Sequence, residues 1–201
     1  MAVRDGMTDI ISELRQLTAT VEGESTLNGT ELWTDEQLQD VLDRYRRVVR
    51  ALPLQPIQSY ESGSLVYQIY PLPTAIRSYR IENSSDAFEV LNSTMIKQAF
   101  GVSYTLNIPS NQVEFLASTG GRTYYANMLL YDINLAAADI WDIKASLRWD
   151  SVDWRTDNHT ISEGDEYEHC VKQALYFRSR AIRSTKWVRT DEAPRMRSLR
   201  S

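Results

Sequence analysis

Apolar residues recur at helical spacing in four stretches of the chain. The most regular one follows Thr34, which forms a capping-box pattern with Gln37. A helix is therefore predicted over 34–52, ended by Pro53. Its apolar stripe consists of Leu38, Val41, Leu42, Tyr45, Val48, Val49 and Leu52. The same spacing predicts three more helices, over 7–22, 132–150 and 163–184.

Between the second and third helices the pattern changes to alternating and β-branched residues, separated by turn residues. Six strands are predicted, over 65–70, 76–81, 88–91, 103–108, 113–117 and 123–130. Turns are predicted at 109–112 and 118–121. Pro71 and Pro73 place the stretch around them at a sheet edge or a crossing.

These elements predict an α+β fold, in which a helical bundle of about four helices carries an antiparallel β insertion between its second and third helix. The parts are N-terminal helices over 1–53, a β-rich insertion over 54–131, C-terminal helices over 132–184 and a basic C-terminal arm over 185–201. The arm lacks apolar periodicity and contains Pro194, so we expect it to be extended.

Length and composition favour one globular domain and exclude several enzyme classes. The chain has 201 residues, of which 42% are hydrophobic and 24% charged. No apolar run approaches the roughly 18 residues of a membrane helix, and no secretory signal is expected. One cysteine excludes an intramolecular disulfide, and no phosphate-binding glycine loop or nucleophile-elbow motif is present.

The charge is unevenly distributed along the chain. The formal net charge is −5, but residues 178–201 contain eight basic and two acidic residues and so carry +6. The remainder therefore carries −11, which makes an acidic body with a basic tail. Such a tail is suited to docking on an acidic surface.

Two groups of residues are candidates for chemistry. Cys170 and His169 are adjacent on a predicted helix and diverge by about 100°, so a buried structural cysteine is favoured over a thiol nucleophile. Acidic residues surround His159, among them Asp153 and Asp157, and could bind a hard cation. A metal-dependent hydrolase is therefore an alternative, although the spacing matches no EF-hand and the acids also suit a loop and a helix N-terminus. We expect no cofactor, no bound metal and no catalytic residues.

The tail combines arginines with apolar side chains. Three interpretations remain open for it: docking on a protein groove, a solvated tail, and binding to nucleic acid. Apolar anchors between arginines favour a protein groove over phosphate contact alone. The candidate docking residues are Trp187, Arg189, Arg195, Met196, Arg197, Leu199 and Arg200.

Two stretches resemble a known family. LWTDEQLQDVLDRYRRVVR, residues 32–50, resembles the start of head-to-tail connector (adaptor) proteins of tailed bacteriophages, where a short helix and a polar loop precede such a sequence. YDINLAAADIWDIKAS, residues 131–146, is similar to a second pattern of that family, which precedes a Ser/Asp-rich loop and a helix ending in arginines. The insertion over 54–131 is longer than compact members carry.

The resemblance implies a structural virion protein of the phage neck rather than an enzyme. It implies a homo-oligomeric ring of about twelve copies that joins the portal protein to a stopper or tail-completion protein. Double-stranded DNA would pass through the lumen without sequence-specific contact, and the C-terminal arm would dock on the portal. The expected location is the head-tail interface of the virion, after assembly in the host cytoplasm and without a membrane.

Overall fold

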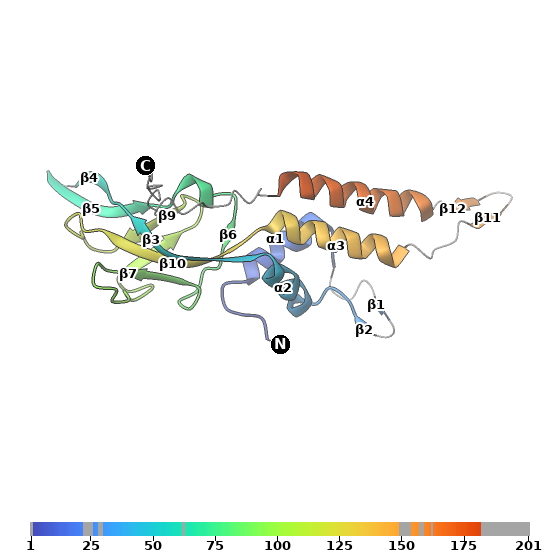
Figure 1. Ribbon diagram of the computed structural model, residues 1–201, viewed down its shortest axis with the longest axis horizontal. Coiled ribbons are helices and arrows are strands. Elements are labelled where there is room, and N and C mark those ends of the chain that lie inside the picture. The colour runs from blue at the N-terminus through green and yellow to red at the C-terminus, as the bar shows by residue number, and fades with distance from the viewer. Residues whose placement is uncertain are drawn as a thin grey trace, which may run out of the picture.

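The computed structural model describes residues 2–21, 26–27, 30–61, 63–148, 154–156, 159–161 and 163–181. These form an elongated molecule with helices in one half and sheets in the other (Figure 1). The helices are α1 (Thr8–Thr18), α2 (Asp35–Arg44), α3 (Ile133–Arg148) and α4 (Glu163–Arg180), with a short 3-10 helix, η1, at Thr74–Ile76. The α+β prediction is confirmed, with two antiparallel sheets between α2 and α3.

The strands of the described residues form two four-stranded sheets and two short hairpins. The first sheet contains β3 (Arg46–Leu54), β10 (Tyr124–Tyr131), β6 (Arg80–Ile81) and β7 (Phe88–Leu91). In it, β3, β6 and β7 each pair with β10. The second has the order β4 (Ile57–Glu61), β5 (Ser64–Pro71), β9 (Gln112–Phe115) and β8 (Tyr104–Asn107). The hairpins join β1 (Thr26–Leu27) to β2 (Thr30–Glu31), and β11 (Trp154–Thr156) to β12 (His159–Ile161).

The helix predicted over 34–52 is wrong beyond Arg44. Its start is confirmed, since Thr34 and Gln37 form the reciprocal capping box. The chain then leaves the helix at Tyr45 and continues as β3, which pairs with β10 from Arg46 to Leu54. The apolar spacing of this stretch allows either a helix or a strand, and the β-branched Val48 and Val49 fit a strand. Pairing with the long strand β10 decides in favour of the strand.

Most predicted strands are found within a few residues of their expected bounds, and β7 matches its prediction at both ends. The exception is the strand predicted over 76–81. There the chain makes η1 after Pro73 and then only the two-residue β6. Sequence analysis also missed β4, although it is a short alternating stretch that Gly63 follows closely.

Each half has its own hydrophobic core. The helical core joins all four α-helices, and the small residues Ala136 and Ala137 of α3 bring that helix close to Cys170 and Ala174 of α4. The β core lies between the two sheets and contains a cluster of ring contacts. That cluster consists of Tyr70, Phe88, Phe100, Tyr104, Phe115 and Tyr124, with ring centroids 4.5 to 6.2 Å apart.

The end of α1 is fixed by side chains from α3. Lys144 Nζ donates to the carbonyl oxygens of Thr18 at 2.7 Å and Ala19 at 3.0 Å, and Trp141 Nε1 donates to that of Leu17 at 3.3 Å. These bonds satisfy carbonyls that a helix leaves unpaired at its C-terminus. The helical half is thereby held by contacts between elements far apart in the sequence.

Candidate functional site

The predicted docking residues of the tail fall outside the described part of the chain. They are Trp187, Arg189, Arg195, Met196, Arg197, Leu199 and Arg200, all within 182–201. The structure does show where that segment starts. Helix α4 runs from the β12 side toward the β half and ends at Arg180, whose carbonyl oxygen accepts from Asn134 Nδ2 of α3 (Figure 1).

The thiol lies in the helical core, as predicted. Cys170 is 3% exposed, and His169 lies edge-on to the Trp141 ring at 5.6 Å between centroids. The buried cysteine is therefore a packing residue, and its exposed neighbour does not form a nucleophile–base pair with it.

The acidic loop of the metal hypothesis is not tested by the structure. Asp153, Asp157 and the side chain of His159 lie outside the described residues. Among the side chains that are described, no group of three or more His, Cys, Asp or Glu could hold a metal ion. None of the helices in this part combines the length and apolar character that a bilayer span requires.

A polar cluster joins the two halves, and Arg4 is its centre. Its guanidinium makes a bidentate pair with Asp43 of α2, with both N–O distances 2.7 Å. The same group donates to the Tyr131 hydroxyl at 2.9 Å and contacts Glu82 at 3.4 Å. Its backbone N–H donates to Gln39 Oε1 at 2.8 Å.

Glu82 is the buried anion of this cluster. Its side chain is 3% exposed, and it accepts from the Tyr131 hydroxyl at 2.5 Å. Burial, and then this bond to the carboxylate, raise the pKa of Tyr131 above its usual range. Arg4 supplies the positive charge that a buried carboxylate needs. The N-terminal segment therefore links α2 to the ends of β6 and β10.

An open cleft of about 600 Å³ lies between α1 and the β8–β9 hairpin. Ile10 and Ile81 form part of its apolar wall, and Leu106, Ile108 and Pro109 line the other side. This cleft was not expected from the sequence, because its two walls are about 95 residues apart along the chain.

Polar groups mark the rim of the cleft. Arg80 of β6 and Glu13 of α1, which both line the cleft, form a bidentate pair with N–O distances of 2.5 Å. Hydrogen bonds to Glu114, first from Gln112 and then from Asn107, lower the pKa of that carboxyl. Asp9, also on the rim, is exposed.

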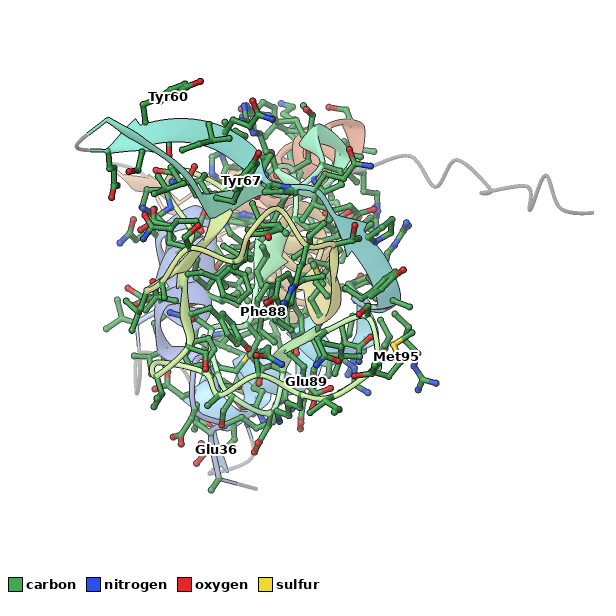
Figure 2. All side chains as sticks on the ribbon, turned by 90° about the vertical axis from the view of Figure 1, so that its left-hand side faces the viewer. Glu36, Tyr60, Tyr67, Phe88, Glu89 and Met95 are labelled. Atoms are coloured by element: carbon green, nitrogen blue, oxygen red, sulfur yellow. The ribbon has the colours of Figure 1, made fainter. Side chains whose placement is uncertain are left out.

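Apolar side chains are exposed at the β end of the molecule. Figure 2 shows Tyr60 of β4 projecting from the upper margin, whereas Phe88 lies near the middle and Met95 near the side. Tyr60 is 78% exposed, Ile57 48% and Leu65 40%. All three belong to the β4–β5 hairpin, whose β4 pairs with β5 alone among the described strands.

The described side chains therefore form three features of interest: the Arg4 cluster, the cleft beside α1 and the exposed β4–β5 hairpin. Sequence analysis missed the Arg4 cluster, the cleft and the exposed hairpin, and only the hairpin left a signal, the alternating stretch before Gly63. Comparisons with models of known families, with curated proteins and with solved structures found no match for this chain.

Proposed function

We propose that this protein is a structural adaptor of a tailed-phage neck. About twelve copies form a closed ring that joins the portal to a stopper or tail-completion protein at the head-tail interface of the virion. The ring extends the DNA channel, and the arm over 185–201 docks on the portal. The chain performs no catalysis in this role, needs no cofactor, and assembles in the host cytoplasm.

One observation carries the proposal: the two stretches that resemble the adaptor family pack on each other. Trp33, Leu38 and Leu42 from the first share the helical core with Ile133 and Ile140 from the second. At the end of the first stretch, the Asp132 N–H donates to the Tyr45 carbonyl at 3.4 Å. The quoted patterns therefore describe one packed unit, as expected if they encode a common body.

The charge distribution also supports an adaptor. A channel lined by an acidic body repels the phosphates of DNA and lets the duplex pass. The body carries −11 and the segment over 178–201 carries +6, which suits an arm that grips an acidic partner. Trp187, Met196 and Leu199 supply apolar anchors between these charges.

Native mass spectrometry, with and without chelator, is the first test. A metal-free ring of about twelve copies supports the adaptor, and a stoichiometric divalent ion lost with chelator would favour the hydrolase alternative instead. A metal-free monomer leads to a portal pull-down with the full chain and with a deletion of 185–201. We expect the deletion to keep its melting temperature and lose the portal, and a deletion that still docks at full affinity overturns the docking role of the arm.

The same preparation tests the nucleic-acid alternative. Binding through the basic arm would give an affinity for DNA that falls steeply with salt and disappears with the deletion. For an adaptor we expect no DNA binding at physiological salt, because the acidic body opposes it.

A further inference from the structure

The cleft between α1 and β8 has the features of a strand-binding groove. Strand β8 ends its sheet and pairs with β9 alone. Apart from an isolated bridge between Phe100 and Tyr104, its other edge has no strand partner among the described residues. Thr105, Leu106 and Asn107 of this edge line the cleft. An extended segment can add to such an edge through backbone hydrogen bonds.

The groove has walls that suit a mixed apolar and basic occupant. Ile108 and Pro109 are exposed at one wall, and Asp9 and Glu114 stand on the rim. Asp9 makes no ion pair with any described residue, and a single basic residue, Arg80, lines the cleft. With Glu13 included, the acidic side chains outnumber the basic ones by three to one.

The chain itself contains a segment of the matching chemistry. Residues 182–201 carry six basic and two acidic side chains. The stretch KWVRT, over 186–190, places Trp and Val between basic residues and ends in Thr, a composition that favours a strand. Pro194 follows and ends any strand pairing.

The described chain ends where this segment can reach the cleft. Helix α4 ends at Arg180, whose carbonyl oxygen accepts from Asn134 Nδ2 at 3.5 Å. Just before Asn134 in the chain, Tyr131 ends β10 and pairs with Arg80, which lines the cleft. Four residues, 182–185, lie between Ala181 and residue 186, so the Cα atoms of these two residues can be up to about 17 Å apart when the chain is extended. Attachment to the same chain gives the segment an effective concentration in the millimolar range.

We propose that, in the free chain, the stretch over 186–190 adds as a strand to the open edge of β8 and occupies this cleft. The arm is stored on its own body, with its basic residues at the acidic rim, until a partner withdraws it. This inference rests on the proposed function only for the identity of that partner. Docking on the portal then has to displace the arm from the cleft. While the arm occupies the cleft, it cannot bind to another free copy of the chain.

Disulfide trapping in the full chain tests the proposal without a portal. Thr105, exposed on β8, is changed to Cys and combined in turn with a cysteine at each position from 186 to 190. The native Cys170 is buried and stays in place. We expect intramolecular crosslinks at a rate independent of protein concentration, with yields that alternate along the stretch because strand side chains alternate. Gln58→Cys, on the equally exposed edge strand β4, is the matched control and should crosslink at least tenfold less.

A charge variant adds a second measurement. Asp9→Lys should slow crosslinking about threefold at low salt, as expected for an exposed ion pair, while Asp40→Lys on α2 should leave the rate unchanged. Equal yields from β8 and β4, or crosslinks that form only between copies, overturn the proposal. A chain that crosslinks as expected but binds no portal supports this inference and contradicts the proposed function. A chain that binds the portal but does not crosslink supports the proposed function and contradicts this inference.

Discussion

Arg4 and Asp43 form a bidentate ion pair between the N-terminal segment and α2, with both N–O distances 2.7 Å. Arg4 also faces the buried Glu82, which follows β6, and Tyr131, which ends β10. One cation therefore holds the helical half and the β half together. The neighbouring Gly6 allows this path, because its φ of +83° and its close approach to the Asn83 backbone leave no room for a Cβ.

Replacing Arg4 by Ala should lower the free energy of unfolding by about 2 kcal/mol. Removal of one partner from a fully buried ion pair costs about 3–5 kcal/mol, and the partial exposure of Arg4 reduces that figure. Chemical denaturation measures the change. Arg44→Ala is the control, since its exposed pair with Asp139 at 3.9 Å should contribute less than about 0.5 kcal/mol. Equal losses of unfolding free energy in the two variants would mean that the Arg4 cluster contributes no more to stability than an exposed ion pair.

Tyr131→Phe should remove about 1–2 kcal/mol of stability, because Glu82 loses a hydroxyl donor in a buried site. Tyr125→Phe, on the same strand, makes a matched control, since no hydrogen bond of its hydroxyl is found among the described residues. Urea unfolding of both variants gives the comparison. A neutral effect of Tyr131→Phe would show that Arg4 alone satisfies the carboxylate.

Two tyrosines with raised pKa values, Tyr104 and Tyr45, predict a loss of stability at alkaline pH. Burial raises the pKa of Tyr104 to about 12, and burial, with a hydrogen bond and charge from Asp139, raises that of Tyr45 to about 12. In the unfolded chain both phenols ionise near 10. Stability is therefore fully present below pH of about 10 and is lost as the pH rises toward 12.

Near-ultraviolet absorbance of tyrosinate, followed together with circular dichroism, checks this expectation. Ionisation of Tyr104 and Tyr45 should coincide with unfolding above pH of about 10. Full ionisation of every tyrosine in a still folded chain would contradict the burial of these side chains.

Tyr60→Ser should reduce self-association without lowering the melting temperature. Tyr60 is 78% exposed on the β4–β5 hairpin, so it contributes little to the fold but offers a large apolar contact to another copy. Analytical ultracentrifugation of the assembled protein measures the effect, and an assembly fraction that falls at least fivefold is expected. Leu147→Ser, at the exposed end of α3, is the control in the helical half. An unchanged ring would place the subunit contact elsewhere.

The sequence determined the local elements with strong internal signals. The capping box at Thr34 and Gln37 fixed the start of α2, because the two residues satisfy each other's backbone groups without any distant partner. The alternating residues of β7 and β10 predicted strands whose bounds changed little. The apolar spacing along α4 placed Cys170 in the core.

Tertiary structure decided what followed Arg44 and what joined the two halves. The stretch over 46–54 has apolar residues that fit a helix or a strand, and pairing with β10 made it β3. Arg4, Asp43, Glu82 and Tyr131 carry no shared pattern in the sequence, because the free energy of their contact depends on how distant segments meet. The cleft beside β8 arises in the same way, from a helix near the N-terminus and a hairpin about 95 residues later, so only the packed chain could show it.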